Sequence, residues 1–289
     1  MSGMQGKVVV LTGGTSGIGE AAALKLAKTG ARLVLVARDA SRAEATLKRL
    51  QQVSPGTAHT SHVADLSLVS ETKRVAREIA ATEPRIDVLI NNAGLICARR
   101  QVTVEGYELT FATNHLAYFV LTHGLLAPVL ASAPARIVNT ASEVHRGAKL
   151  DFGDLQSEHG YSGFGVYAKS KLANVLFTTE LARRLSGSGV TANSLHPGVV
   201  ASRFGFPREG QGGDPSSARF LSAHGISPEE GAETIVYLAS AADAAKANGQ
   251  YFNQGRAVTP SKEAQDRAVA KRLWEESERL GGIDYRIEG

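Results

Sequence analysis

Short β-branched segments alternate with Ala-, Leu- and Lys-rich stretches along most of this chain, and this alternation limits its fold more than any other feature. The β-branched segments are four to six residues long, as strands buried on both faces of a parallel sheet are. They are residues 8–11, 32–36, 87–90, 136–139 and 190–195. Parallel strands need crossover connections, and Glu20–Gly30 is typical of one because it is a helix-forming stretch that ends in glycine. The pattern predicts a doubly wound α/β fold, with a parallel β-sheet flanked by helices.

The length and composition favour one domain. A chain of 289 residues with 43% hydrophobic content can bury a sizeable core, so we expect a single domain over residues 1–289. Residues 201–226 are rich in Gly, Pro and Ser and predict a long substrate loop. This loop carries the apolar residues Phe204, Phe206, Phe220 and Leu221, which could cover a bound substrate. Residues 261–280 predict a C-terminal helix.

Charge and cysteine content argue against several classes of protein. The net charge is only +4 and the basic residues are scattered, so we expect no nucleic-acid partner. The single cysteine, Cys97, cannot form an internal disulfide or a Cys-rich zinc site, and it favours a cytoplasmic location and no metal. The apolar segment Val8–Gly14 is too short for a membrane anchor and lacks a signal-peptide pattern.

A glycine-rich turn, TGGTSGIG (Thr12–Gly19), directly follows the first expected strand. Residues without side chains let the backbone approach a pyrophosphate, whose charge the N–H groups and dipole of the following helix stabilise. The spacing G-x-x-x-G-x-G differs from the commoner G-x-G-x-x-G, so a plain glycine turn is the alternative. The position between strand and helix favours a dinucleotide site of the Rossmann type. The expected cofactor contacts here are Gly13, Thr15, Ser16, Gly17, Ile18 and Gly19.

A second motif, YAKSK, places Tyr167 and Lys171 four positions apart. In a helix this spacing puts both side chains on one face. A phenol has a pKa of about 10 and is a poor base at neutral pH, but a nearby ammonium group favours the phenolate. The pair thus predicts an acid/base tyrosine assisted by a lysine, although the same spacing also arises by chance.

Four motifs together resemble one enzyme family. TGGTSGIG, NNAG (Asn91–Gly94), YAKSK and HPG (His196–Gly198) occur in the order and spacing of the short-chain dehydrogenase/reductase family. Ser170–Gly198 and Arg272–Asp284 are most similar to the retinol dehydrogenase-like branch, which includes the WW-domain oxidoreductases. Membrane-bound members of that branch carry an apolar N-terminal anchor that is missing here, which argues against a retinoid substrate.

The resemblance implies a catalytic tetrad of Asn114, Ser142, Tyr167 and Lys171. Ser142 would bind the substrate oxygen, Tyr167 would transfer its proton, and Lys171 would hold the nicotinamide ribose and lower the phenol pKa. Asn114 would keep a water in line with Lys171. Ser142 and Tyr167 are 25 positions apart, a spacing that an insertion explains in the retinol dehydrogenase-like branch. The alternatives are an ordinary turn serine and a helix-capping asparagine.

The resemblance also implies cofactor contacts beyond the glycine turn. Two residues would face the adenine, three would line the cofactor at the end of the sheet, and four would meet the carboxamide side. These are, in that order, Asp65 and Leu66; Asn91, Ala93 and Gly94; and Pro197, Gly198, Val200 and Ser202. Asp65 could instead cap a helix that begins near Val69.

Two arguments about the choice between NAD and NADP disagree. Asp39 lies twenty positions beyond the last glycine, where an acid usually binds the ribose hydroxyls of NAD. In the resembling family, however, the discriminating acid is the last residue of the second strand, and Ala37 stands there with Arg38 next. The Arg38 guanidinium suits a 2′-phosphate, so we expect NADP(H) in preference to NAD(H). Asp39 then has a structural role at a helix start, where Ser41 and Glu44 match a capping box.

The sequence therefore predicts an NADP(H)-dependent oxidoreductase that interconverts an alcohol and an aldehyde or ketone, with Tyr167 as acid/base. The apolar residues of the substrate loop favour a lipophilic small-molecule substrate. A non-catalytic dinucleotide-binding or scaffold protein and a sugar-nucleotide epimerase on the same fold are the alternatives. A homo-oligomer is left open.

Overall fold

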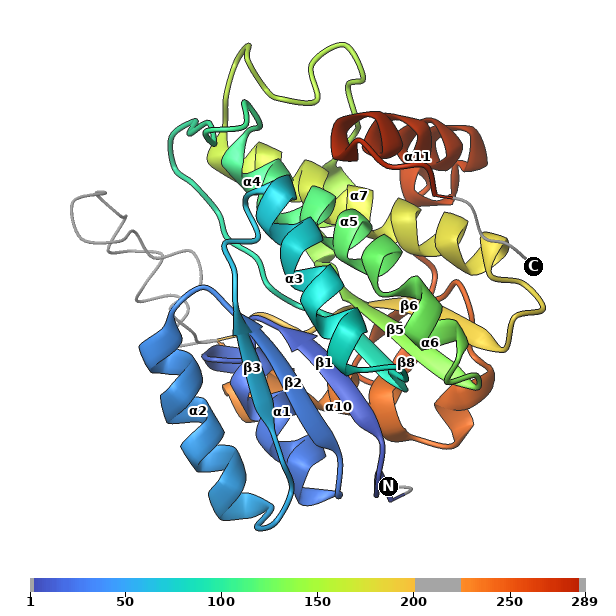
Figure 1. Cartoon of the computed structure of the whole chain (residues 1–289). Coiled ribbons are helices and arrows are strands. Elements are labelled where there is room, and N and C mark those ends of the chain that lie inside the picture. The colour runs from blue at the N-terminus through green and yellow to red at the C-terminus, as the bar shows by residue number, and fades with distance from the viewer. Residues whose placement is uncertain (1–2, 201–224, 286–289) are drawn as a thin grey trace.

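An eight-stranded sheet runs through the computed structural model, which describes residues 3–200 and 225–285 (Figure 1). The strand order is β3-β2-β1-β4-β5-β6-β7-β8, and every neighbouring pair is parallel except β7 and β8. The strands are β1 (Val8–Thr12), β2 (Arg32–Ala37), β3 (Thr60–Val63), β4 (Val88–Asn91), β5 (Ala135–Thr140), β6 (Val190–His196), β7 (Tyr251–Asn253) and β8 (Arg256–Val258). The chain order reverses direction across β1 and β4, as in doubly wound folds, so the expected fold class is confirmed.

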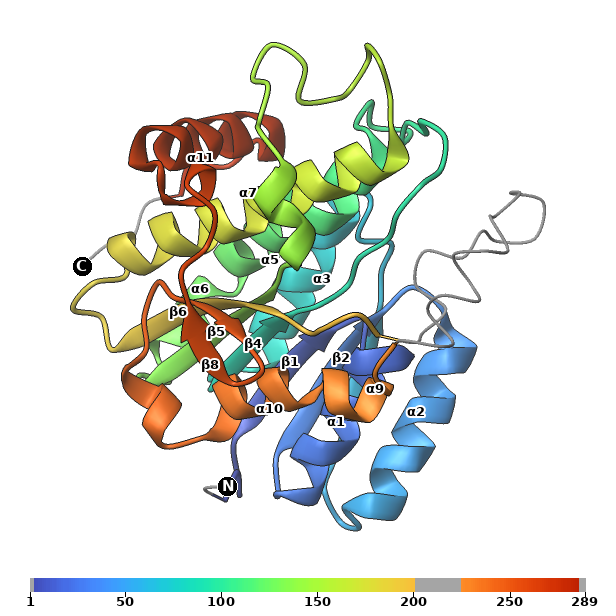
Figure 2. The same cartoon turned by 180° about the vertical axis from the view of Figure 1, so that it is seen from behind.

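Helices cover both faces of the sheet (Figures 1 and 2). One face carries α1 (Gly17–Lys28), α2 (Ala40–Val53), α9 (Pro228–Gly231) and α10 (Glu233–Ser240). The other carries α3 (Val69–Thr82), α4 (Leu109–Phe111), α5 (Ala117–Gly124), α6 (Leu126–Leu130) and α7 (Gly163–Arg184), and α11 (Arg267–Gly281) packs outside α7. Short turns of other helix types are η1 (Ala112–Leu116, π-helical), η2 (Glu143–Gly147), η3 (Asp243–Lys246) and η4 (Glu263–Gln265).

Burial on both faces of the sheet explains why the central strands β1, β2 and β4 are almost wholly apolar. Along β1, Val9 and Leu11 pack against α1 and α10, whereas Val10 packs in the cluster formed with α3 and α5. Both sets are buried, so no polar residue is needed between them. Trp274 of α11 reaches the second cluster, with its ring centroid 4.9 Å from that of Phe119. Truncating such a buried ring typically costs about 3–5 kcal/mol, so this contact anchors α11.

The five strands expected from sequence are confirmed to within one residue at each end, but β3, β7 and β8 were not expected. Strand β3 lies at the edge of the sheet, is polar, and has exposed side chains at both of its ends. Strands β7 and β8 form a hairpin whose turn residues, Gln254 and Gly255, have φ angles of 49° and 71°. A two-residue turn of this kind needs positive φ at both positions, and Gln-Gly is a weaker turn signal than Asn-Gly.

The start of α2 differs from the expected capping box. Asp39 is the N-cap residue, and its carboxylate accepts a hydrogen bond of 3.0 Å from the backbone N–H of Arg42. Ser41 lies inside the first turn, so the capping box expected of Ser41 and Glu44 is wrong. The structural role expected for Asp39 is confirmed, because its side chain caps α2. Such a cap typically stabilises a helix by about 1 kcal/mol.

The C-terminal helix begins later than residues 261–280 suggested. Asp266 accepts hydrogen bonds from the N–H groups of Ala268 and Val269, and α11 therefore starts at Arg267. Most of the expected substrate loop, residues 201–224 with Ser202, lies outside the described residues. The two ends of that loop meet, because Val200 and Ile226 form a parallel bridge.

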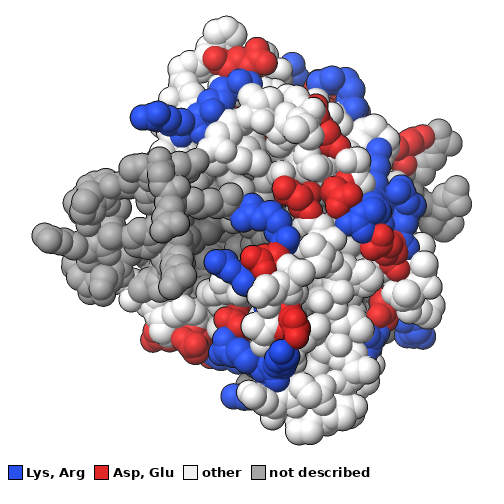
Figure 3. All heavy atoms as spheres, turned by 60° about the vertical axis from the view of Figure 1, so that its left-hand side comes forward, with Lys and Arg blue, Asp and Glu red and all other residues white. Residues whose placement is uncertain are grey.

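The surface on the side of β3 carries both signs of charge. On the face drawn in Figure 3, Lys and Arg side chains are interspersed with Asp and Glu. Such mixing does not form the continuous basic stripe that nucleic-acid binding uses. Among the helices of residues 3–200 and 225–285, none has the length and apolarity needed to cross a membrane.

Candidate active site and cofactor cradle

The glycine turn lies between β1 and α1 and has the form that a pyrophosphate needs. Gly13 and Gly17 have positive φ angles of 68° and 54°. A Cβ on Gly19 would lie 2.1 Å from the carbonyl oxygen of Gly13, so only glycine allows α1 to pack this closely on the turn. The N-cap, Ser16, makes no side-chain hydrogen bond to the first turn. The backbone N–H groups in the first turn of α1 can therefore bind an anion. The glycine turn and this first turn together fit the phosphates of a dinucleotide.

Arg38 follows the carboxyl end of β2, and the glycine turn follows the carboxyl end of the neighbouring strand β1. Strand β2 ends at Ala37, as expected, and the Gly13 N–H donates a hydrogen bond of 3.2 Å to the carbonyl of Val36. The Arg38 side chain is exposed, and no carboxylate within residues 3–200 and 225–285 forms an ion pair with it. The guanidinium is thus open to a phosphate near the turn.

Asp65 does not cap α3. Its carboxylate accepts a hydrogen bond of 3.0 Å from the Ser67 N–H, which closes a local turn after β3. Instead, Glu105 accepts hydrogen bonds from the first N–H groups of α3, including that of Val69 at 2.5 Å. The helix-cap alternative for Asp65 is therefore wrong. The side chain of Leu66 is 8% exposed and belongs to the core, so a cofactor could meet mainly its backbone.

Asn91 belongs to a buried network of polar side chains between the sheet and the helices α5 and α7. Its amide nitrogen donates to Thr122 Oγ1 at 3.0 Å and to Asn139 Oδ1 at 2.8 Å. Asn139 in turn donates to Thr178 Oγ1 at 2.9 Å. These bonds fasten β4 and β5 to α5 and α7. Because the Asn91 side chain is fully buried here, the expected cofactor contact is restricted to its main chain.

The residues after β4 lie between the glycine turn and Lys171. Thr12 Oγ1 accepts hydrogen bonds from the N–H groups of Asn92 and Ala93 at 2.9 and 3.0 Å, which ties this segment to the glycine turn. A Cβ on Gly94 would lie 3.6 Å from Lys171 Nζ. Ala93 and Gly94 therefore connect the two motifs, as a ligand that spans both of them requires.

The segment after β6, residues 197–200, lies beside the start of α1. Gly198 has a φ angle of 93°, and the Ile226 N–H donates to the carbonyl of Val199 at 2.8 Å. The methyl groups of Val200 and Ile18 both pack against Gly231. The HPG segment, which includes Pro197, is thus brought to the N-terminal end of α1.

Tyr167 and Lys171 lie one turn apart on α7, as expected. The helix begins at Gly163, and Ser162 caps it by accepting a hydrogen bond of 3.3 Å from the Gly165 N–H. Lys171 Nζ lies 5.5 Å from the centroid of the Tyr167 ring and donates to the carbonyl of Thr140 at 3.0 Å. The lysine is only 2% exposed. It is held between α7 and the end of β5.

Ser142 follows the end of β5 and contacts Tyr167. Its side chain makes no cap bond to η2, and its hydroxyl forms a hydrogen bond with the phenol of Tyr167. This contact supports a catalytic assignment over an ordinary turn serine. The inserted residues between Ser142 and Tyr167 pack against the start of α4, because the Gln156 side chain accepts a hydrogen bond of 2.7 Å from the N–H of its N-cap residue, Glu108.

Asn114 lies inside the π-helical segment η1, so the capping alternative is wrong. Its side chain is fully buried and bonds both backbone groups of Leu95, accepting from N at 2.8 Å and donating to O at 2.9 Å. It also donates to Ser170 Oγ at 3.0 Å. Asn114 therefore fastens the segment after Gly94 to α7. Single π-helical turns frequently occur at functional sites.

The pKa values of Tyr167 and Lys171 are both shifted by burial. Burial raises the pKa of Tyr167 to about 12, and the Ser142 contact opposes this only in part. Burial lowers the pKa of Lys171 to about 7. Without a cofactor, desolvation dominates the pKa values of both groups, and the lysine is itself only partly charged at pH 7. That Lys171 lowers the phenol pKa when a cofactor is bound stays a prediction. At neutral pH the site holds Tyr167 as a proton donor.

Replacing Lys171 with methionine is expected to stabilise the cofactor-free protein near pH 7. Unfolded Lys171 keeps its proton up to a pKa of about 10.5, whereas the folded one loses it above about 7. Between these values the unfolded state binds more protons, so wild-type stability rises with pH. The gain of the Lys171→Met variant should be about 2–4 kcal/mol at pH 7 and should vanish toward pH 10.5.

Urea unfolding at pH 7, 8.5 and 10 measures this gain. Lys169→Met is the matched control, because Lys169 lies on the same helix but is not fully buried. The control should show no such dependence on pH. A Lys171→Met variant less stable than wild type at pH 7 would contradict the prediction.

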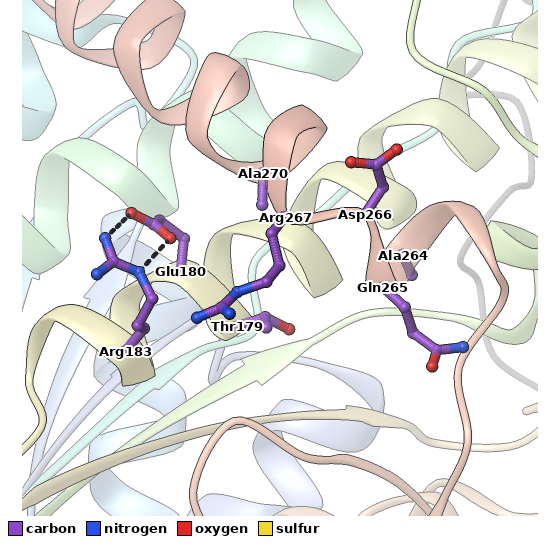
Figure 4. Close-up of a pocket in the computed structure, with 8 residues that line it drawn as sticks. All are labelled: Thr179, Glu180, Arg183, Ala264, Gln265, Asp266, Arg267 and Ala270. Atoms are coloured by element: carbon purple, nitrogen blue, oxygen red, sulfur yellow. Dashed lines mark hydrogen bonds and ion pairs between the residues drawn. The ribbon is translucent and has the colours of Figure 1, made fainter.

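A separate cavity of about 60 Å³ lies between α7 and the C-terminal segment (Figure 4). It is lined by Thr179, Glu180, Arg183, Ala264, Gln265, Asp266, Arg267 and Ala270. Glu180 and Arg183, joined by a 2.6 Å ion pair, stand at its wall. None of the tetrad residues lines this cavity. Within the described ranges, no three His, Cys, Asp or Glu side chains gather in a way that could hold a metal ion.

The fold and the site define a dinucleotide-binding α/β protein with a Tyr–Lys pair at the edge of its cradle. The short chain dehydrogenase family model matches residues 7–208, and the chain belongs to this family. It is 40% identical to human retinol dehydrogenase 13 over 283 residues, which is 96% of this chain and 86% of that protein. It is also 40% identical to mouse retinol dehydrogenase 14, over 97% of this chain and 87% of that one.

Solved structures agree with this assignment. A Mycobacterium paratuberculosis protein described as uncharacterized has a TM-score of 0.79 and 29% identity, covering 99% of this chain and 97% of its own. The Pseudomonas aeruginosa RhlG/NADP complex has a TM-score of 0.70 and 27% identity, covering 90% and 97%. The chain is thus an NAD(P)-dependent oxidoreductase of alcohols and carbonyl compounds in the retinol dehydrogenase-like branch. The scaffold and epimerase alternatives are not supported.

Proposed function

We propose that this protein interconverts a lipophilic alcohol and its aldehyde or ketone with NADP(H), using Tyr167 as the acid/base. The observation that carries the proposal is the convergence of the Ser142–Tyr167 contact and Lys171 beside Gly94, at the end of the glycine-turn cradle. A proton donor, a second hydrogen-bond donor and a lysine amine then surround one edge of the expected nicotinamide position. This is the arrangement that carbonyl reduction requires.

Each residue has a separate task in this chemistry. When bound, NADP(H) would supply the hydride for reduction of the carbonyl carbon and would accept it in oxidation of the alcohol. The phenol of Tyr167 donates its proton to the carbonyl oxygen in reduction and takes the alcohol proton in oxidation. The Ser142 hydroxyl donates a hydrogen bond to the same oxygen and opposes its movement. Lys171 would hold the ribose hydroxyls, and Asn114 would keep a water in line with it.

The position of Arg38 and a similar structure solved with NADP support NADP(H) over NAD(H). Arg38 is exposed beside the glycine turn, and the last residue of β2 is Ala37 rather than an acid. A carboxylate at the end of that strand would repel a 2′-phosphate, whereas a guanidinium can bind it with two hydrogen bonds. The similar RhlG structure was solved with NADP.

A lipophilic substrate is favoured by one exposed ring and by the relatives. Phe164 lies three residues before Tyr167 on α7 and is 64% exposed. Exposed aromatic rings beside a reactive group offer apolar contact area to a ligand. The named relatives are retinol dehydrogenases, whose alcohol is long and apolar.

A panel of carbonyl compounds with NADPH tests this proposal. We expect kcat/KM for decanal and dodecanal to exceed that for xylose and glyceraldehyde by at least about tenfold, since each buried methylene contributes about 0.8 kcal/mol. Phe164→Ser should lower kcat/KM for the long aldehydes only. A preference for the sugars would contradict the lipophilic assignment, and turnover of none would favour a non-catalytic binding protein.

The remaining expectations concern the setting of the enzyme. We propose a cytoplasmic location, supported by the presence of only one cysteine, Cys97, which cannot form a disulfide within the chain. Imaging of the tagged full chain tests it, and a signal confined to membranes would contradict it. Self-association stays a prediction that sedimentation can measure.

A further inference from the structure

His145 lies three residues after Ser142 in η2, is fully buried, and joins two distant parts of the chain. Its Nδ1 is 2.7 Å from the carbonyl oxygen of Ser142. Its Nε2 is 3.1 Å from the backbone nitrogen of Ser261, which is 116 positions further along the chain. The imidazole is therefore a bridge between the residue that bonds Tyr167 and the segment after β8.

The partners of the ring determine its tautomer. A carbonyl oxygen only accepts hydrogen bonds, so Nδ1 must carry a proton toward Ser142. A backbone N–H only donates, so Nε2 must offer its lone pair to Ser261. One neutral tautomer satisfies both contacts. Burial favours this state, because it holds the pKa of His145 below its ordinary value.

Other contacts hold η2 against the same C-terminal region. The ring of Tyr251 meets that of His145 edge-on, with centroids 4.8 Å apart, and the Tyr251 hydroxyl donates to Glu143 at 3.0 Å. Arg146 donates to the carbonyl of Thr259 at 2.8 Å. The turn is thus fastened to β7 and to the segment before η4. The Ser142 carbonyl accepts a hydrogen bond of 3.2 Å from the His145 N–H as well as the one from the ring, and the imidazole extends this connection to Ser261.

The charged and titratable groups near His145 come from several elements. Glu143 and Arg146 lie on η2, His196 ends β6, Tyr251 lies on β7 and Glu263 begins η4. Glu143 is engaged by Arg146 and Tyr251. The ring therefore has fixed partners, and its two hydrogen bonds are to backbone groups. The arrangement is suited to holding a position rather than to transferring a proton.

We propose that His145 is a positioning residue, which holds the Ser142 main chain against Ser261 so that the Ser142 hydroxyl points toward Tyr167. This inference rests on the proposed function, in which both Ser142 and Tyr167 act on the substrate oxygen. It assigns a role to the backbone N–H of Ser261, which orients the imidazole, and none to the Ser261 side chain. A hydroxyl displaced by about 1 Å can lower the rate about 100-fold.

Three variants of His145 separate positioning from bulk packing. His145→Asn keeps a donor near Nδ1, His145→Gln places an amide near Nε2, and His145→Leu removes both hydrogen bonds. With NADPH and decanal, we expect His145→Leu to lower kcat about 10- to 100-fold while the Kd of NADPH changes less than about twofold. His145→Asn should regain at least about tenfold, and more than His145→Gln, because it keeps the bond to Ser142.

Ser261→Ala is the matched control. It leaves the Ser261 N–H in place for His145 and removes only the hydroxyl that accepts from the Ala264 N–H at 3.2 Å. It should lower Tm without lowering kcat. If His145→Leu does not fold, the comparison of His145→Asn with His145→Gln decides: a higher kcat for Asn supports positioning, and equal or reversed values overturn it.

The remaining outcomes distinguish this inference from the proposed function. If Tyr167→Phe keeps its turnover, the proposed function fails. If Tyr167→Phe is inactive while His145→Leu keeps wild-type kcat, or while Asn and Leu lose kcat equally, the positioning role is overturned and the imidazole only supports the fold.

Discussion

The Tyr167→Phe variant is expected to lose at least about 99% of kcat while binding NADPH almost as tightly as the wild-type protein. Phenylalanine keeps the ring and its contact near Lys171, but it has no proton to give to the substrate oxygen. Removing a positioned acid/base typically costs about 100- to 10,000-fold in rate. The hydrogen bond with Ser142 is lost at the same time.

Single-turnover kinetics and NADPH titration together measure this effect. Tyr161→Phe is the control, because Tyr161 lies before α7 begins and its hydroxyl bonds the backbone carbonyl of Cys97 at 3.0 Å and Glu108 Oε1 at 3.4 Å. The control should keep most of its kcat. A Tyr167→Phe variant with more than about a tenth of wild-type kcat would mean that another group moves the proton.

The Arg38→Ala variant is expected to weaken NADPH binding about 10- to 150-fold and to leave NADH binding nearly unchanged. This range corresponds to about 1.5–3 kcal/mol, as for a hydrogen bond to a charged group. The effect is selective because the two cofactors differ only in the 2′-phosphate. The exposed position of Arg38 after β2 lets the loss of its side chain leave the core intact.

Dissociation constants for both cofactors, measured with wild type and variant, test this prediction. Arg49→Ala is a suitable control, since Arg49 also belongs to the α2 region but forms an ion pair of 2.5 Å with Glu20. The control should change neither constant by more than about twofold. Equal losses for NADPH and NADH, or a wild-type preference for NADH, would show that Arg38 does not bind the phosphate.

The local parts of the site could be predicted from the sequence because their geometry depends on neighbouring residues. The spacing of Tyr167 and Lys171 places them on one face of any helix, and the glycines between β1 and α1 permit the positive φ angles that the turn adopts. Apolar segments of strand length, separated by helical stretches, specify a parallel sheet through local periodicity. The polar edge strand β3 and the Gln-Gly hairpin lacked such signals.

Only the tertiary structure decided which distant groups meet and how burial changes their chemistry. Glu105 caps α3 from 36 positions away, a task that the sequence suggested for Asp65. His145 contacts Ser261, which is 116 positions away, and the Asn91 amide donates to Asn139 in the buried polar network between the sheet and the helices α5 and α7. Burial raises the pKa of Tyr167 and lowers that of Lys171. These outcomes depend on contacts and desolvation created by packing, which the spacing of residues along a chain does not contain.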